Sequence, residues 1–258
     1  MQYAPATSTR TGLVLATDLD GTFAGGTPAE RRALQAALRA ASDALLLYVT
    51  GRSAAATREL MDGVDLPHPD VLVCDVGTSV LAGPDLAPVT AVEAELEALW
   101  PGAAAVRERL EGLAGIEEQE IRAPRRVSYW LREGAMDDVL ARMAGRLEDL
   151  PVELVGSAGV YLDVLPAGVN KGTTLRRVLR WLGRAEADVV VAGDSLNDLA
   201  LFETGLRGVV VGNCEPALRE RLGERAHLYH ATGHGAAGIL EGLHHFGCLA
   251  AKGGEDGE

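Results

Sequence analysis

The stretch Leu13-Val14-Leu15-Ala16-Thr17-Asp18-Leu19-Asp20-Gly21-Thr22 decides how the rest of the chain is interpreted. A short apolar run that ends in turn-forming residues is typical of a strand buried inside a sheet. Asp18 and Asp20 therefore lie at the carboxyl end of this strand, where open α/β sheets bind their ligands. Because Asp is a poor strand former, two of them here indicate a chemical role, which metal or phosphate chemistry would supply.

Apolar strands and amphipathic helices alternate in the first and last thirds of the chain. The pattern Thr27-Pro28-Ala29-Glu30 predicts a helix start, since Thr is a favoured N-cap, Pro fits the first helical position and Glu completes a capping box. Apolar stretches predict buried strands at 13–17, 45–49, 71–74, 188–192 and 208–211. This order predicts an α/β fold with a doubly wound, Rossmann-like parallel sheet and helices on both of its faces.

The pattern changes between these two parts of the chain. From about residue 85, helical segments and short strands are joined by turns, which is typical of an antiparallel sheet with helices. We therefore predict a core formed by 1–84 and 166–258, and an inserted α+β domain at 85–165. The two ends, 1–12 and 250–258, are predicted to be flexible or disordered.

Composition and charge indicate which classes of binding partner are disfavoured. The net charge of −13 disfavours binding to nucleic acid or to anionic membranes, so an anionic substrate needs local positive charge at its site. No apolar run is long enough to span a membrane and no secretory signal is apparent, which favours the cytoplasm. The three cysteines lie far apart, which argues against a disulfide framework or a zinc site.

Four positions at predicted strand ends or helix starts carry the residue types that phosphoryl transfer needs. They are Asp18 with Asp20, Thr50, Lys171, and Asp194 with Asp198. One carboxylate can act as nucleophile and a second can carry a proton, while a hydroxyl and a cation hold phosphoryl oxygens. The remaining acids suit a hard cation such as Mg²⁺. Only two of the 24 basic residues are Lys, namely Lys171 and Lys252, and Lys252 lies in the polar tail.

Several of these residues also have a purely structural alternative. Thr50 could be an N-cap or turn residue, and Asp198 could simply stabilise the first turn of a helix. Lys171 could be a solvated residue at a helix start. A cation at a helix N-terminus opposes the helix dipole, however, so its position favours a functional role.

The same motifs identify a family resemblance. The four matching segments are Asp18-Leu19-Asp20-Gly21-Thr22, Thr50-Gly51-Arg52, Lys171, and Gly193-Asp194-Ser195-Leu196-Asn197-Asp198. In this order they resemble the motifs of the haloacid dehalogenase superfamily of phosphohydrolases. The insert resembles the α+β cap of that superfamily's second cap class, found in Cof-type sugar phosphatases.

Three further segments resemble the sucrose-phosphate phosphatase family and related bacterial enzymes. They are Val76-Gly77-Thr78-Ser79-Val80, Val127-Ser128-Tyr129, and Ala236-Ala237-Gly238-Ile239-Leu240-Glu241-Gly242-Leu243. Gly21 departs from the pattern, because plant and cyanobacterial members carry Asn there. The resemblance implies a Mg²⁺-dependent phosphatase acting on sucrose-6-phosphate or a related glycosyl phosphate.

Roles transfer to this sequence by resemblance. Asp18 is expected to form an aspartyl-phosphate, Asp20 to act as acid and base, and Thr50 and Lys171 to hold the phosphoryl oxygens. The implied metal set is Asp18, Asp20 through its backbone carbonyl, Asp194 and Asp198, the last of which would orient Lys171 or a metal-bound water. The implied substrate-binding residues are Thr22, Gly51, Arg52, Ser195, Asn197 and Tyr129.

Some points stay open at this level. Arg52 could neutralise phosphate or pair with a surface acid. Strand residues alternate faces, so one of the neighbours Tyr129 and Trp130 is expected to lie in the core of the cap. The run 117–120 could be a solvated edge or could bind sugar hydroxyls. A sugar phosphomutase, a broad-specificity Cof-type phosphatase and a non-catalytic sugar-phosphate-binding protein remain alternatives. The expected partner is a small phosphorylated sugar, and the chain is expected to be a monomer or a small homo-oligomer.

Overall fold

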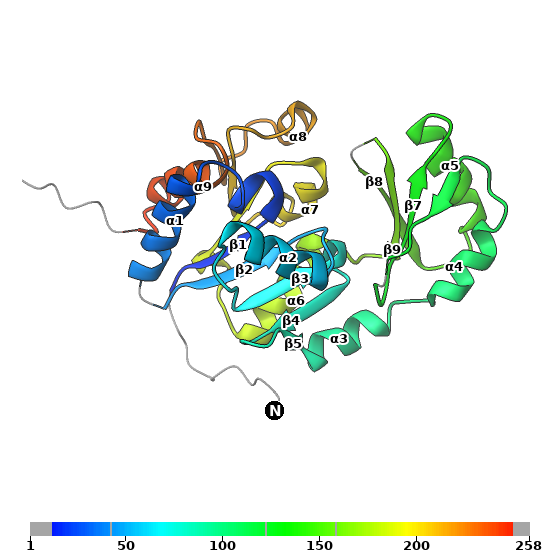
Figure 1. Cartoon of the computed structure of the whole chain (residues 1–258), viewed down its shortest axis with the longest axis horizontal. Coiled ribbons are helices and arrows are strands. Elements are labelled where there is room, and N and C mark those ends of the chain that lie inside the picture. The colour runs from blue at the N-terminus through cyan, green and yellow to red at the C-terminus, as the bar shows by residue number, and fades with distance from the viewer. Residues whose placement is uncertain (1–11, 42, 122, 158, 250–258) are drawn as a thin grey trace, which may run out of the picture.

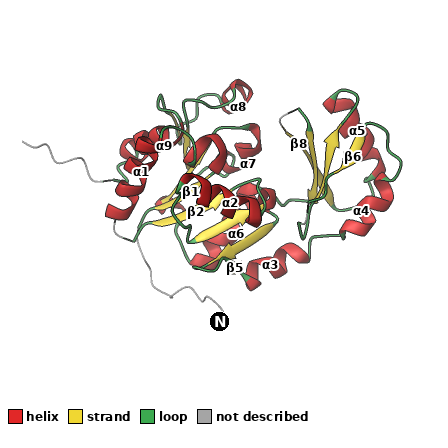
Figure 2. Cartoon of the chain, in the orientation of Figure 1, coloured by secondary structure: helices red, strands yellow, loops and turns green. Residues whose placement is uncertain are grey.

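The computed structural model describes residues 12–41, 43–121, 123–157 and 159–249, so the predictions for 250–258 and for most of 1–12 lie outside the described residues. Two parts are evident in Figure 1, a larger one with helices around a long sheet and a smaller one with its own sheet. We refer to them as the core and the cap. Figure 2 shows helices on both sides of the core sheet. No helix in the described part of the chain is long and apolar enough to cross a bilayer.

The core sheet has eight strands, with β1 (Val14–Thr17) in its middle. In sheet order the strands are β12 (Leu228–His230), β11 (Arg207–Val210), β10 (Val189–Gly193), β1, β2 (Leu45–Val49), β3 (Val71–Cys74), β4 (Ser79–Ala82) and β5 (Ala87–Pro88). The strands from β12 to β3 are parallel, and β4 and β5 continue the sheet in antiparallel pairing. The prediction of a doubly wound α/β core is confirmed.

Successive residues of β1 explain why helices cover both faces of the sheet. Val14 and Ala16 belong to one apolar cluster and Leu15 to another, because side chains alternate between the faces of a strand. Leu15 shares its cluster with helices α1 (Pro28–Ala40), α2 (Ala54–Val64) and α9 (Gly235–His245). The opposite face is covered by α3 (Thr90–Glu97), α6 (Lys171–Leu182), α7 (Leu199–Phe202) and α8 (Pro216–Leu222).

The helix start predicted at Thr27 is confirmed. The Thr27 hydroxyl accepts a hydrogen bond from the Glu30 N–H, and the Glu30 carboxylate accepts one from the Thr27 N–H at 2.6 Å. Such a cap stabilises a helix by about 1 kcal/mol. It fixes the entry into α1 directly after the turn that carries Asp20.

The cap is an antiparallel sheet with helices on one face. Its strands, in sheet order, are β6 (Ile116–Glu118), β7 (Val127–Leu131), β9 (Tyr161–Pro166) and β8 (Val152–Ser157). Helices α4 (Ala103–Leu110) and α5 (Met136–Arg146) bury Val106 and Met143 against this sheet. The α+β character predicted for the insert agrees with this arrangement.

The start of the insert differs from the predicted residue 85. β5 pairs with β4, and α3 buries Val92 and Leu96 in the same apolar cluster as Leu175 of α6. These elements therefore belong to the core, and the chain crosses to the cap between α3 and α4. It returns between the end of β9 at Pro166 and Lys171.

Candidate active site

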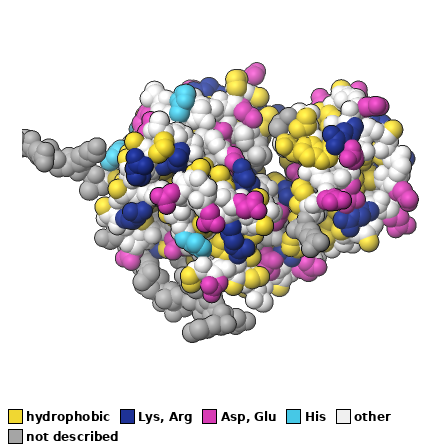
Figure 3. All heavy atoms as spheres, in the orientation of Figure 1, with side chains coloured by type: hydrophobic (Ala, Val, Ile, Leu, Met, Phe, Trp, Pro, Cys, Tyr) yellow, Lys and Arg dark blue, Asp and Glu magenta, His cyan; other side chains and the backbone are white. Residues whose placement is uncertain are grey.

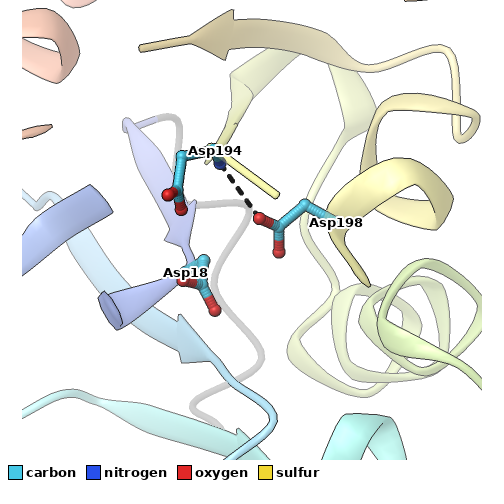
Figure 4. A group of neighbouring side chains, drawn as sticks. All are labelled: Asp18, Asp194 and Asp198. Atoms are coloured by element: carbon cyan, nitrogen blue, oxygen red, sulfur yellow. Dashed lines mark hydrogen bonds between the residues drawn. The ribbon is translucent and has the colours of Figure 1, made fainter. Parts of the chain in front are cut away.

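The acidic residues predicted from the motifs meet at the carboxyl ends of β1 and β10. Asp18 directly follows β1, Asp194 directly follows β10, and Asp198 lies in the short turn after it. Their carboxylates face a common space (Figure 4), and one oxygen of each lies within 4.8 Å of the others. The two parallel strands are neighbours in the sheet, so segments far apart in the sequence share one edge.

Lys171 is the cation of this group. Its ammonium donates to Asp18 Oδ1 at 2.7 Å, to Asp198 Oδ1 at 2.6 Å and to Asn197 Oδ1 at 2.6 Å, and its side chain is fully buried. Burial alone would lower the pKa of Lys171, but the two carboxylates outweigh it and raise the pKa above its ordinary value. All three donors of the ammonium have acceptors, which excludes the alternative of a solvated residue.

Asp198 holds the loop and the lysine together. While its Oδ1 accepts from Lys171, its Oδ2 accepts from the backbone N–H of Asp194 at 3.0 Å and of Ser195 at 3.1 Å. Gly193 makes this close approach possible, because a Cβ there would lie 2.6 Å from the Asp198 Cβ. Asp198 therefore does more than stabilise a helix start, because its carboxylate both closes the turn and orients Lys171.

The acidic group carries more negative charge than Lys171 balances. Burial raises the pKa of Asp18 to about 8 and that of Asp194 to about 6. Oxygen ligands in this number suit a hard divalent cation, which would offset the excess negative charge. The residues therefore fit a metal ion, with Asp18 and Asp194 placed to hold it and Asp198 beside them. Thr22 fixes the Asp194 carboxylate by donating to its Oδ1 at 2.7 Å.

Gly21 has a backbone conformation that suits Gly and that Asn tolerates. Its φ of +73° lies in the left-handed region, which Gly adopts without strain and Asn tolerates. A Cβ at this position would lie 2.3 Å from Asp194 Oδ2. Gly therefore keeps the turn that Asn can also form, and it leaves the Asp194 carboxylate where it stands.

Asp20 and Arg52 face each other above the acidic group. The guanidinium donates from Nε to Asp20 Oδ2 and from Nη2 to Asp20 Oδ1, both at 2.7 Å. These hydrogen bonds raise the pKa of Arg52. Both side chains are partly exposed, so the pair is weakly held and can open to a ligand. Arg52 thus pairs with an acid of the site itself rather than with a remote surface acid.

The loop 50–52 contributes backbone as well as side chains. The Thr50 hydroxyl is buried and accepts a hydrogen bond from the Arg52 N–H at 3.2 Å. Gly51 and Arg52 line the adjoining cavity, whereas Thr50 lies behind them. The Gly51 N–H takes part in no hydrogen bond among the described residues, so it can donate to a ligand oxygen.

A cavity of about 1040 Å³ lies over these groups and is lined by both core and cap. Its core side includes Asp18, Asp20, Gly51, Arg52, Asp194, Ser195 and Asn197. Its cap side combines apolar residues with a few polar ones, namely Ile121, Met136, Leu140, Val155, Gln119, Arg126, Tyr161 and Asp163. In Figure 3, acidic and basic side chains are interspersed over the visible face of the molecule.

The predicted substrate residue Tyr129 does not lie in this cavity. Its ring is 5% exposed and packs in the apolar cluster of the cap, under α4 and α5. Its neighbour Trp130 points to the opposite face and lies 4.9 Å from the Tyr161 ring, as the alternation of strand residues requires. The aromatic residue at the cavity is therefore Tyr161, and the prediction for Tyr129 is corrected.

Sequence reasoning missed several cap residues that line the cavity. Tyr161 and Asp163 lie on one face of β9, and Asp163 is paired in register with Ser128 of β7. The period-two pattern of β9 could have placed Tyr161 and Asp163 on one face, but not on the face that lies toward the core. Gln119, from the acidic run considered for sugar binding, lines the cavity, whereas Glu117 and Glu118 form ion pairs with Arg132 and Arg107.

Comparison with known proteins agrees with this geometry. The chain is 40% identical over 242 residues to a glucosylglycerol-phosphate synthase of Pseudomonas anguilliseptica, a match that covers 93% of this chain but 32% of that protein. It is 32% identical to a mannosylfructose-phosphate phosphatase of Agrobacterium fabrum, with 91% of this chain and 96% of that protein covered. The chain spans about half of tobacco sucrose-phosphatase 1, at 32% identity over 216 residues and 79% of this chain.

Solved structures show that the similarity includes the fold. The sucrose-phosphatase of Synechocystis sp. PCC6803, determined in complex with sucrose and phosphate, superposes with a TM-score of 0.83 at 30% identity, covering 93% of this chain and 100% of that one. A haloacid dehalogenase-like hydrolase of Bacillus subtilis shares the fold with a TM-score of 0.69 at 15% identity, covering 95% of each chain. Residues 11–247 match the family described as sucrose-6F-phosphate phosphohydrolase. The chain therefore belongs to the sucrose-6F-phosphate phosphohydrolase family, and its fold is that of haloacid dehalogenase-like hydrolases.

Proposed function

We propose that this protein is a Mg²⁺-dependent phosphatase that hydrolyses the phosphomonoester of a glycosyl phosphate. The observation that carries the proposal is the position of Lys171, whose ammonium joins Asp18 and Asp198 directly beneath a cavity shared by core and cap. A module that only binds a sugar phosphate gains nothing from placing several carboxylates beside its anionic ligand. A nucleophile held by a buried cation is what covalent phosphoryl transfer needs.

Asp18 is the proposed nucleophile. Its Oδ1 accepts from Lys171, while its Oδ2 takes part in no hydrogen bond among the described residues. In the first step an oxygen of Asp18 bonds to phosphorus and the bond from phosphorus to the sugar oxygen breaks. Lys171 stays cationic throughout and offsets the charge on the transferring group.

Asp20 is the proposed proton carrier. In the first step it gives a proton to the departing sugar oxygen, and in the second it takes one from the water that attacks phosphorus and releases Asp18. In the structure both of its oxygens accept from Arg52, so the pair has to open during the cycle. The incoming phosphoryl group offers Arg52 another anion, which favours this opening.

The donor residues around Asp18 define the proposed metal site. Asp18 and Asp194 would hold Mg²⁺, which when bound would withdraw charge from the phosphoryl oxygens. Thr22 orients Asp194, and Asp198 orients both Lys171 and the Asp194–Ser195 backbone. The Gly51 N–H is the proposed donor to the phosphoryl oxygens from the other side, and the buried Thr50 hydroxyl, which accepts from the Arg52 N–H, is proposed to hold the loop behind it.

The proposed substrate is a phosphorylated disaccharide or a glycosylated polyol phosphate. A cavity of about 1040 Å³ is at the upper end of the roughly 300–1,000 Å³ typical of small-molecule sites, so it exceeds what a monosaccharide phosphate needs. The relatives named for sucrose phosphate, mannosylfructose phosphate and glucosylglycerol phosphate share this class of ligand.

Phosphate release from a panel of substrates tests the proposal. The panel holds sucrose-6-phosphate, mannosylfructose phosphate, glucosylglycerol phosphate and glucose-6-phosphate, each with Mg²⁺ and with excess EDTA. We expect release from at least one of the first three, a lower kcat/KM for glucose-6-phosphate, and loss of activity in EDTA that Mg²⁺ restores. Undiminished turnover in EDTA, or an isomerised sugar phosphate in place of free phosphate, would contradict it.

A further inference from the structure

Two consecutive arginines of the cap, Arg125 and Arg126, reach into the core just before β7. Both are buried, with side chains 5% and 7% exposed. Arg125 donates to the carboxylates of Glu93 and Glu97 on α3 and to the Thr78 carbonyl. The proposed mechanism uses neither residue. They resemble each other in burial and ion pairing, but they contact different parts of the core.

Arg126 contacts the loop beside the proposed phosphoryl site. Its Nη1 donates to the Gly51 carbonyl at 3.1 Å, and its Nη2 donates to Asp75 Oδ1 at 2.9 Å. Nη1 also lies 3.8 Å from Asp163 Oδ1 on the cap strand β9. Arg126 lines the cavity, and its buried Nε has no hydrogen-bond partner within the described part of the chain. One guanidinium therefore joins the loop 50–52, the turn after β3 and the cap sheet.

The loop 50–52 is held by all three of its carbonyls. The Thr50 carbonyl accepts from the Val76 N–H at 3.2 Å, and the Arg52 carbonyl accepts from the Asp75 N–H at 2.8 Å. The Gly51 carbonyl, between them, accepts from Arg126. Within one planar peptide the C=O of a residue and the N–H of the next residue point in opposite directions, so the Gly51 carbonyl held by Arg126 fixes the direction of the Arg52 N–H, which donates to the Thr50 hydroxyl. Arg126 thus holds the middle of the three peptides.

The turn that holds the other two carbonyls is strained. Asp75 has a φ of +52° and Val76 a φ of +61°, in the left-handed region that a β-branched residue avoids. Val76 also lines the cavity. Strain of this kind persists only where surrounding contacts impose it, and the Asp75–Arg126 ion pair is such a contact.

We propose that Arg126 is a positioning residue that sets the orientation of the peptide between Gly51 and Arg52, in the middle of the loop, and that it links this orientation to Asp163 of the cap. The inference rests on the proposed function, since it concerns the loop that would bind the phosphoryl group. When the cap is seated, Arg126 bonds the Gly51 carbonyl and the loop presents its donors to the cavity. When the cap moves away, Asp163 draws the guanidinium with it and the loop loses its central contact.

Arg125 provides a matched control for Arg126. The variants Arg126→Ala, Arg126→Lys and Arg125→Ala are compared with the unaltered protein, using inorganic phosphate as a competitive inhibitor and a disaccharide phosphate as substrate. We expect Arg126→Ala to raise the Ki of phosphate about tenfold, as for the loss of a charged hydrogen bond at the loop. Arg126→Lys is expected to restore part of this loss, because Lys can reach one of the two acceptors.

The Arg125→Ala variant distinguishes a positioning role of Arg126 from a role in which it only anchors the cap to the core. We expect it to lower the Tm about as much as Arg126→Ala, but to leave the Ki of phosphate unchanged. An equal Ki in the unaltered protein and in Arg126→Ala, or an equal rise in both alanine variants, would overturn the inference. If Arg126→Ala does not fold, Arg126→Lys with an unchanged Ki overturns it. Failure of the unaltered protein to release phosphate would instead count against the proposed function.

Discussion

The core end and the cap end of the cavity are built differently. At the core end, buried charged and polar groups are joined by hydrogen bonds, as in the three that Lys171 donates and the four that Asp198 accepts. At the cap end, apolar side chains such as Met136 and Leu140 alternate with a few polar ones such as Gln119. The polar groups of the core end depend on one another through these bonds, whereas apolar residues such as Met136 and Leu140 are expected to tolerate substitution better. From this difference we expect that the core determines the chemistry and that the cap determines which sugar is bound.

The largest effect is expected from the Asp18→Asn variant. The amide can still accept from Lys171 but cannot act as a nucleophile, so kcat should fall by at least about 10³-fold. Circular dichroism and Tm should remain close to those of the unaltered protein. Full turnover in this variant would contradict the proposal that Asp18, at the core end, is the nucleophile. Asp149→Asn, which removes an exposed ion-pair partner of Arg109 in the cap, serves as the control.

The Lys171→Met variant should lose both activity and stability. Removing the buried cation leaves the carboxylates of Asp18 and Asp198 without their cationic partner, and breaking a buried ion pair in this way costs about 3–5 kcal/mol. We expect a lower Tm and a kcat reduced by at least about 100-fold. Arg180→Met on the same helix α6, where the side chain is 66% exposed, should change neither. A stable Lys171→Met protein would mean that Lys171 does not offset the buried charge of Asp18 and Asp198 as described.

A cap substitution should change the choice of sugar and leave the phosphoryl site intact. Gln119 lines the cavity and donates to the Tyr129 carbonyl at 2.9 Å. We expect Gln119→Ala to raise KM for a disaccharide phosphate about 5–10-fold, as for the loss of one or two neutral hydrogen bonds. The Ki of inorganic phosphate should not change. A rise in that Ki would show that the two ends of the cavity are not separable.

The smallest effect is expected from Tyr129→Phe. The ring lies in the apolar cluster of the cap, away from the cavity, so kcat, KM and the substrate ranking should stay within about twofold. Steady-state kinetics on the same substrate panel measures this. A loss of activity with only some of the substrates would indicate that Tyr129 contacts the sugar after all.

The core end of the cavity is well predicted by the sequence because its signals are local. Each acidic motif follows an apolar strand, and parallel strands bring their carboxyl ends together, so the amino-acid pattern alone is enough to place Asp18 and Asp194 side by side. The same logic places Lys171 at the start of a helix at that edge. The bonds of Asp198 to two backbone N–H groups could not be foreseen, because they depend on the turn that Gly193 permits.

The cap end is harder to predict because its signals are not local. Which face of β7 meets the cavity depends on its pairing with β9 and on the helices behind it, so the prediction for Tyr129 chose the wrong side. The roles of Arg125 and Arg126 depend on contacts with residues tens of positions away in the sequence. The predicted start of the insert is too early because α3 has no pattern that separates it from a cap helix. Its place is decided by packing on α6.

The central position of β1 also has a consequence for synthesis of the protein. One neighbour, β2, follows within the same stretch of chain, but the other, β10, pairs Val14 with Val189. On the ribosome, β1 therefore presents an open edge until the whole cap has been made. The cap can complete its own sheet during this interval, since β6 to β9 are consecutive in the chain. Closure of the core around β10 can therefore come only after the cap has been made, and it is also the event that brings Asp194 and Asp198 to Asp18.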